Sequence, residues 1–214
     1  MKKGCILCLL ISVISLPLIA QNIIYSNLKE LLTQHGDTTA VLRVEKRSRN
    51  QIVLTGGADY RITAGDDESM CRRLKKRCFA VRDEKGNLYL NCRKLRYKKL
   101  RFGAWYAPAV QLGKNIYFCA MPLGSVIGGN FVEEDDVKLG GNIGDALAAS
   151  SLVTKRVCYE LNGETGKVDF LGKDRMLQLL NNYPELKQAY LKDDSQEAKH
   201  TFKYLLELQN KQKK

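Results

Sequence analysis

Histidine is scarce in this chain of 214 residues, which contains only His35 and His200. Neither lies in a recognisable motif beside a nucleophile, so a Ser-His-Asp or Cys-His catalytic site has no local support. The CxxC and HxxxH spacings of common metal sites are also missing after residue 20. These absences predict no catalytic residue, no metal site and no cofactor, and they favour a binding or structural protein over an enzyme.

A phosphate-binding loop is missing as well. The stretch 139–152 contains three glycines, but no Lys-Ser or Lys-Thr pair follows them. A phosphate loop needs that pair to hold the phosphates and the magnesium ion. We therefore interpret this stretch as a small-residue helix or a close-packed loop.

Long apolar runs are confined to the first 20 residues. Two lysines precede the apolar run Gly4–Leu16, and a short segment ending in Ala20 follows it, which is the pattern of an export signal. We predict cleavage after Ala20 and export of the remaining chain. An uncleaved anchor is the alternative, because the 17 residues from Gly4 to Ala20 reach the lower limit for spanning a bilayer. No transmembrane helix is expected in the remaining chain.

The number of cysteines is odd, so they cannot all pair with one another. Residues 1–20 hold two of the seven cysteines, so five remain after them. An oxidising compartment then allows at most two disulfides and leaves at least one thiol unpaired. In the hairpin described below, Cys78 and Cys92 fall on opposite faces, which argues against a bridge between them. We interpret the cysteines as small buried side chains.

Acidic residues are fewer than basic ones, so the chain has a formal net charge of +12. The net charge is +10 without the two lysines of residues 1–20. The excess lies in residues 71–101, where 13 Lys or Arg stand against Asp83 and Glu84. The basic part of this stretch, with the aromatic pair after it, is our candidate anion-binding site. Its residues are Arg93, Lys94, Arg96, Lys98, Lys99, Arg101, Trp105 and Tyr106. The alternative is a solvated strand face, partly balanced by the acidic run Glu133–Asp136.

The most regular local pattern is a β-hairpin in residues 79–92. Apolar residues alternate with polar ones on both sides of Lys85 and Gly86, and glycine tolerates the positive φ of a tight turn. A further strand, apolar on both faces, is expected over residues 115–121. The predicted hairpin pairs are Asp83 with Leu88, Val81 with Leu90, and Phe79 with Cys92.

Hairpins and helices are predicted for most of the remaining chain. Strands at 40–45 and 51–55 are expected to pair with each other, and a short strand follows at 60–62. A hairpin near residues 159–170 pairs Tyr159 with Phe170 and Leu161 with Val168. Helices are predicted over 27–34, over 69–77 and in the C-terminal part, where Pro184 opens one helix and Asp194 forms a capping box with Glu197 for the last.

The predicted fold class is α+β. Antiparallel β-hairpins form a sheet or an open barrel, and a C-terminal helical pair packs on it or beside it. The expected parts are a signal peptide at 1–20, a mainly β domain with a short N-terminal helix at 21–172, and a C-terminal helical segment at 173–214.

Several motifs in combination resemble a protein family. They are LYLNC at 88–92, the glycine- and alanine-containing stretch 140–150 leading into KRVCYELNGETGKV at 155–168, YPELKQAY at 183–190 and KYLLELQN at 203–210. With them the chain resembles a family of small, uncharacterised exported proteins of the Bacteroides group. The resemblance covers most of the chain after residue 20. It implies a bacterial envelope origin, with no assigned activity and no catalytic residue to transfer. With the export signal, it places the protein in the periplasm, at the outer membrane or outside a bacterial cell.

Together these features predict an exported, envelope-associated binding or structural protein whose partner is anionic, a lipid phosphate or an acidic glycan, or is another envelope protein. Nucleic acid is the less favoured partner, because exported proteins rarely meet it. Two alternatives stay open. One is an enzyme of unknown class that uses an unpaired cysteine. The other is a protein–protein scaffold, which needs an exposed apolar stripe among Met176, Leu180, Tyr190 and Phe202.

Overall fold

The computed structural model describes residues 21–39, 41–123, 125–127, 130–132, 154–193, 195 and 197–213. The predicted signal peptide, the acidic run Glu133–Asp136 and the stretch 139–152 lie outside the described residues. Among the helices in the described ranges, none combines the length and the hydrophobicity needed to span a bilayer.

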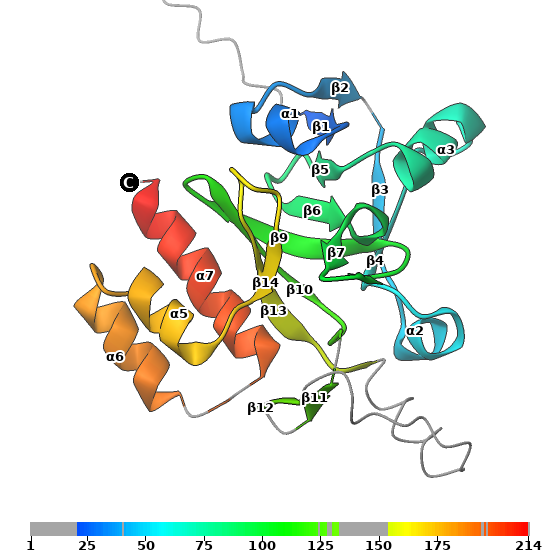
Figure 1. Ribbon diagram of the computed structural model, residues 1–214. Coiled ribbons are helices and arrows are strands. Elements are labelled where there is room, and N and C mark those ends of the chain that lie inside the picture. Colours follow the sequence, from blue (N-terminus) through cyan, green and yellow to red (C-terminus); the bar gives the residue numbers. More distant parts are fainter. Residues whose placement is uncertain are drawn as a thin grey trace, which may run out of the picture.

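An antiparallel sheet of ten strands forms the body of the protein (Figure 1). Its strand order is β14-β13-β10-β9-β6-β5-β1-β2, and β3 joins it through β4, which pairs with β9. The sheet is not closed, because β2 and β14 form its two ends. The α+β prediction is therefore confirmed, with an open sheet. The strands are β1 Asn22–Tyr25, β2 Asp37–Thr39, β3 Arg43–Lys46, β4 Tyr60–Thr63, β5 Ala80–Arg82, β6 Leu88–Asn91, β9 Tyr106–Leu112, β10 Asn115–Ala120, β13 Val157–Leu161 and β14 Val168–Phe170.

Two short strand pairs and a set of helices surround this sheet. The pairs are β7 Arg96–Tyr97 with β8 Leu100–Arg101, and β11 Ser125–Ile127 with β12 Asn130–Val132. The helices are α1 Leu28–Thr33, α2 Arg49–Thr55, α3 Glu68–Lys76, the 3-10 helix η1 Cys92–Lys94, α5 Lys173–Leu179, α6 Pro184–Lys192 and α7 Ala198–Gln212. Helices α5, α6 and α7 lie together on one side of the molecule, and α2 and α3 lie on the other (Figure 1).

Both faces of the sheet are buried against other elements. On one face, Phe118 and Tyr159 belong to a cluster that also takes in residues of α1 and of the β7–β8 pair. On the other face, Tyr117 packs with the C-terminal helices, and Val81 packs with Leu74 of α3 and with β4. Because successive strand residues point to opposite faces, neighbouring residues of one strand enter different clusters.

The predicted hairpin at 79–92 is present as β5 and β6, but its predicted register is wrong by one residue. Five residues, Asp83 to Asn87, connect the two strands. Among them Gly86 has a φ of +82°, and its N–H donates to Asp83 O at 2.9 Å. The Asp83 carboxylate accepts from the N–H groups of Lys85 at 3.0 Å and Asn87 at 2.8 Å. These side-chain hydrogen bonds fix a longer loop than the strand pattern indicates. The observed pairs are Ala80 with Leu90, Val81 with Tyr89, and Arg82 with Leu88.

The strand predicted at residues 51–55 is wrong, because this segment belongs to helix α2. Ser48 and Gln51 form a capping box: Gln51 N donates to Ser48 Oγ at 3.3 Å, and Ser48 N donates to Gln51 Oε1 at 2.8 Å. Leu54, which the strand prediction placed on an apolar face, is 83% exposed. Strand β3 therefore pairs with β4 instead.

The C-terminal part is helical, with three helices where the sequence predicts a pair. Pro184 occupies the first turn of α6, and the β13–β14 register predicted for Tyr159 and Phe170 is confirmed. The predicted capping box of the last helix is wrong. Glu197 is the N-cap residue of α7 and makes no side-chain cap hydrogen bond, and Asp194 lies outside the described residues.

Candidate functional site

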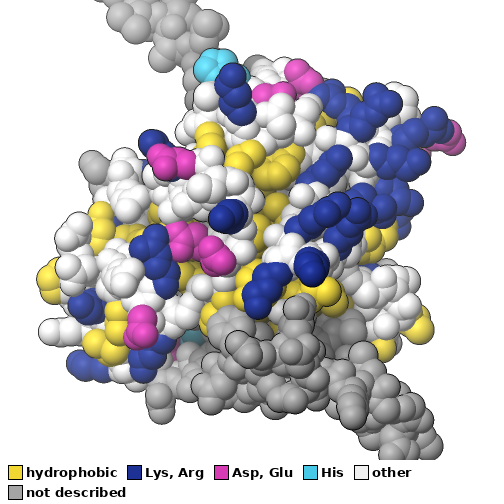
Figure 2. Space-filling view, in the orientation of Figure 1, with side chains coloured by type: hydrophobic (Ala, Val, Ile, Leu, Met, Phe, Trp, Pro, Cys, Tyr) yellow, Lys and Arg dark blue, Asp and Glu magenta, His cyan; other side chains and the backbone are white. Residues whose placement is uncertain are grey.

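The basic members of the predicted site are exposed and come from one short segment. The segment consists of η1 and the β7–β8 pair, which forms a hairpin. Figure 2 shows Lys and Arg side chains gathered in a band over this hairpin and over α3. The exposed basic residues of the two regions are Arg72, Lys75, Lys76, Arg77, Arg93, Lys94, Arg96, Lys98, Lys99 and Arg101.

The β7–β8 hairpin points its basic side chains outward and its aromatic ones inward. Tyr97 and Phe102 are buried, whereas Arg96 and Arg101 are exposed. The two arginines are directly opposed in the strand register, and like charges in that position destabilise a strand pair. The turn between the strands is formed by two lysines, of which Lys98 has a φ of +51°. A non-glycine residue adopts this left-handed conformation at an energetic cost.

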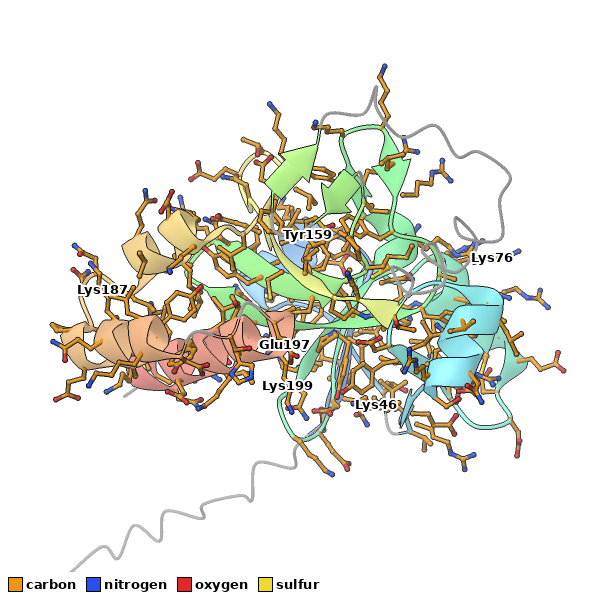
Figure 3. The ribbon with its side chains drawn as sticks, turned by 90° about the horizontal axis from the view of Figure 1, so that it is seen from below. Lys46, Lys76, Tyr159, Lys187, Glu197 and Lys199 are labelled. Atoms are coloured by element: carbon orange, nitrogen blue, oxygen red, sulfur yellow. The ribbon has the colours of Figure 1, made fainter. Side chains whose placement is uncertain are left out.

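Buried aromatic contacts attach the hairpin to the sheet. The Tyr159 ring of β13 lies 5.8 Å from the Tyr97 ring and 4.8 Å from the Phe102 ring, and Phe102 also meets Phe118 of β10 at 5.3 Å. Figure 3 places Tyr159 in the interior among the strands. The aromatic residues within the basic segment therefore fix its position by packing.

Among the described residues, few carboxylates pair with these basic residues. Across the described ranges, one ion pair involves a basic residue of positions 71–101, and it joins Arg73 to Asp37. Lys98 Nζ instead lies 5.7 Å from the centre of the Tyr97 ring. The positive charge of the exposed segment is thus largely left without an ion-pair partner among the described residues.

Helix α3 is held against the sheet by two buried polar side chains. Asn91 is 1% exposed, and its Nδ2 donates to Leu74 O at 3.1 Å and to Cys78 O at 2.9 Å. The Tyr106 hydroxyl donates to the same Leu74 O at 2.8 Å. These bonds satisfy carbonyls at and just beyond the C-terminal turn of the helix. Burial raises the pKa of Tyr106, and its side chain does not lie on the surface with the basic residues.

Replacing Asn91 with alanine should lower the free energy of unfolding by about 2 kcal/mol, because buried carbonyls lose their donor. Chemical denaturation of the purified variant measures this change. Asn50→Ala is the matched control, because Asn50 is exposed in α2 and surface substitutions stay within about 0.5 kcal/mol. Equal effects of the two substitutions would contradict the anchoring role of Asn91.

Trp105, the remaining residue of the predicted site, is half-buried next to arginines of the same chain. The guanidinium carbon of Arg47 lies 5.1 Å from the centre of its ring, and that of Arg61 lies 5.8 Å away. Such cation–π contacts use the face of the indole. The aromatic ring is thus engaged by the protein's own cations.

A cleft that the sequence analysis missed lies beside α2. Arg156 Nε donates to Asp59 Oδ1 at 2.8 Å across 97 positions of sequence, so no local pattern indicates this cluster. Arg47 is buried there and donates to Gly56 O at 2.8 Å and to Ala58 O at 2.6 Å, and burial lowers its pKa. The cleft has a volume of about 420 Å³ and is lined by Lys46, Arg47, Arg49, Ile52, Asp59, Thr154 and Arg156. Four basic side chains and one carboxylate give it a net positive charge.

Cys78 and Cys92 lack the environment of a catalytic nucleophile. Burial raises the pKa of Cys78 to about 11 and that of Cys92 to about 12, whereas a nucleophilic thiol needs a lowered pKa. His35 Nδ1 lies 2.6 Å from a backbone carbonyl oxygen, and His200 Nδ1 lies 2.9 Å from Asp193 Oδ2. Among the described side chains, no group of three or more His, Cys, Asp or Glu could hold a metal ion.

The C-terminal helices turn their apolar side toward the sheet. Met176 and Leu180 are fully buried, and Tyr190 and Phe202 are partly buried in the same cluster. These residues therefore do not form the exposed stripe that the scaffold alternative requires.

Comparison with known proteins assigns the chain to a family. No curated protein matches it, and no solved structure matches it. The profile of a family described as "Family of unknown function (DUF6563)" matches residues 23–212, which is nearly all of the chain after the predicted signal peptide. This confirms the predicted membership of an uncharacterised family, while the Bacteroides grouping stays a prediction. The chain belongs to the Family of unknown function (DUF6563).

Proposed function

We propose that the protein is an exported component of a bacterial cell envelope that binds an anionic partner, a lipid phosphate or an acidic glycan. Binding takes place on the exposed basic residues of α3 and its C-cap, of η1 and of the β7–β8 hairpin, which together form the basic face. Its residues are Arg72, Lys75, Lys76, Arg77, Arg93, Lys94, Arg96, Lys98, Lys99 and Arg101. The proposal involves binding alone and no catalytic step.

The arrangement of the β7–β8 hairpin carries the proposal. Its strands oppose Arg96 to Arg101, and its turn places Lys98 at a φ of +51°. Repulsion weakens such a strand pair, and asparagine or glycine would fit the turn with less strain. The cations thus lower local stability, and an anion bound between them would relieve the repulsion.

The support beneath the basic face favours binding further. Asn91 and Tyr106 hold the end of α3, and Tyr97 and Phe102 pack the hairpin onto Tyr159. A charged surface on such fixed elements loses little conformational entropy when a ligand binds. In the described part of the chain, Arg73–Asp37 is the single ion pair that engages a basic residue of positions 71–101. An anionic ligand therefore meets little competition from the described carboxylates of the protein.

Location outside the cytoplasm is part of the proposal and rests on the first 20 residues. Lysines, an apolar run and a short segment ending in Ala20 follow one another there, in the order of an export signal. An envelope compartment offers lipid phosphates and acidic glycans at high density. The positive charge of the basic face is complementary to the negative charge of both.

Replacing Arg93, Lys94, Arg96, Lys98 and Lys99 with serine should weaken anion binding. A basic side chain near an anionic membrane contributes about 1 kcal/mol, so binding to phosphatidylglycerol vesicles should fall by more than about tenfold. Elution from immobilised heparin should shift to lower salt, because these contacts are screened. Vesicle co-sedimentation and heparin chromatography measure the two effects, and circular dichroism verifies that the variant is folded.

The matched control removes the same charge from the C-terminal helices, with Lys173, Lys187, Lys192, Lys199 and Lys211 changed to serine. Figure 3 places Lys187 on the opposite side of the molecule from Lys76 of the basic face. The control should keep its binding. Equal losses in both variants, or no loss in the first, would refute the basic face. Preference for vesicles or for heparin separates lipid from glycan, and stronger retention on duplex DNA than on both would overturn an envelope partner.

A further inference from the structure

Two cysteines meet directly between neighbouring strands. Cys119 of β10 lies opposite Cys158 of β13 in the antiparallel register, and their Sγ atoms are 2.7 Å apart. This separation lies between the length of a covalent S–S bond, about 2.05 Å, and the distance kept by sulfur atoms that are not bonded. Opposed residues of an antiparallel pair also bring their Cβ atoms close to the spacing that a disulfide needs.

The surroundings of this pair are closed and apolar. Cys119 is 7% exposed and Cys158 is 3% exposed, and both belong to the cluster between the sheet and the C-terminal helices. Ala198 O at the start of α7 lies 3.7 Å from Cys119 Sγ and 3.4 Å from Cys158 Sγ. Burial raises the pKa of Cys119. A bond formed here would be shielded from reducing thiols in solution.

The other cysteines are placed differently. Cys78 Sγ donates to Ala80 O at 3.1 Å, Cys71 Sγ accepts from Ala64 N at 3.3 Å, and Cys92 is fully buried. No sulfur–sulfur contact other than that of Cys119 with Cys158 occurs among the cysteines that the structure describes. The geometry therefore selects one pair out of five thiols.

We propose that Cys119 and Cys158 form a disulfide bond that joins β10 to β13 in the exported protein. The oxidant is a disulfide of a thiol oxidase or of a small thiol. The thiolate of one cysteine attacks the oxidant, forms a mixed disulfide with one of its sulfurs and releases the other as a thiol. The second cysteine then attacks the mixed disulfide and releases the remaining half of the oxidant as a thiol. One S–S bond forms and one breaks, and the two protons end on the reduced oxidant. The inference rests on the export that is part of the proposed function, but not on anion binding.

The bond should stabilise the protein, because it closes a loop between residues 39 positions apart. Restricting the unfolded chain over such a loop corresponds to a rise in Tm of roughly 10 °C for a domain of this size. Thermal unfolding of the oxidised protein, compared with protein that has been reduced while unfolded and refolded with the reducing agent present, measures the difference. A Tm that does not respond to reduction would contradict a bond at this place.

Thiol counting tests the bond without any variant. The protein is refolded with oxidised glutathione present, then unfolded, alkylated and weighed, and we expect alkylation of three of its five described cysteines. A peptide map should then recover Cys119 and Cys158 in one cross-linked product. Alkylation of all five, or a link between another pair, would overturn the proposal. The same analysis on protein extracted from the envelope tests export. A bond found only after oxidation in vitro would refute export to an oxidising compartment but would leave the pairing of Cys119 with Cys158 intact.

A variant pair assigns the stabilisation to the bond. Cys119→Ser with Cys158→Ser should abolish the Tm difference between oxidised and reduced protein, whereas Cys71→Ser should keep it. Heparin retention should be the same for oxidised and reduced protein, because Cys119 and Cys158 are buried and are not part of the basic face. A loss of heparin binding in the serine variant of the basic face, with an unchanged disulfide, keeps the two proposals distinguishable.

Discussion

Replacement of Tyr159 by alanine should lower the free energy of unfolding by about 4 kcal/mol, the range for removing a buried aromatic side chain. Tyr159 is 1% exposed, and its ring meets those of Tyr97, Phe102 and Phe118 at 5.8, 4.8 and 5.5 Å. Alanine would leave a cavity and remove each of these ring contacts. Urea denaturation followed by circular dichroism measures the change, which should appear as a lower midpoint.

Tyr159→Phe is the control, because it keeps the ring and removes the hydroxyl. That hydroxyl accepts from Leu123 N at 2.9 Å and donates to Met121 O at 3.2 Å, so its loss should cost about 1–2 kcal/mol. Tyr159→Ala should also speed amide hydrogen exchange in residues 95–102, since the β7–β8 hairpin would lose its packing partner. Similar stabilities of the two variants would show that the ring contacts are not what holds the hairpin.

The sequence predicts strands best where polar turn residues do not compete with the apolar pattern. The β13–β14 register follows from matched apolar residues such as Leu161 and Val168, whereas in β5–β6 the carboxylate of Asp83 shifts the register. Strand β9 escapes prediction because Pro108, opposite Tyr89 of β6, is a residue that normally argues against a central strand. Helix α2 is not predicted because its residues alternate as in a strand, whereas the capping box of Ser48 stabilises a helix.

The candidate site is predictable where it depends on local alternation. Buried Tyr97 and exposed Arg96 occupy the positions that a half-buried strand implies. Tyr106 is different, because aromatic character alone does not say whether a residue covers the surface or anchors α3. The cleft formed with Asp59 and Arg156 joins residues 97 positions apart, a contact that no pattern along the chain encodes.

Gly163→Ala should be the second strongly destabilising substitution, with a loss of about 3 kcal/mol. Gly163 lies in the β13–β14 loop, and a Cβ atom there would overlap the backbone oxygen of Lys114 in the neighbouring β9–β10 loop and lie 3.1 Å from Leu32 Cδ1. Gly163 N also donates to Asn115 Oδ1 at 3.3 Å. The obstacle is backbone, so relief requires the two loops to separate. Thermal unfolding of the variant measures the loss.

The control is Gly172→Ala, because the nearest side-chain atom to a Cβ at this position is Phe170 Cε1 at 3.8 Å, an ordinary contact. Gly172 is the N-cap residue of α5, and alanine in that position should cost below about 1 kcal/mol. Separation of the loops in Gly163→Ala should also weaken the ion pair of Lys114 Nζ with Glu164 Oε1, which spans them at 2.7 Å. If Gly163→Ala proves as mild as Gly172→Ala, the two loops do not pack against each other in solution, and the end of the sheet that they close is looser than the structure shows.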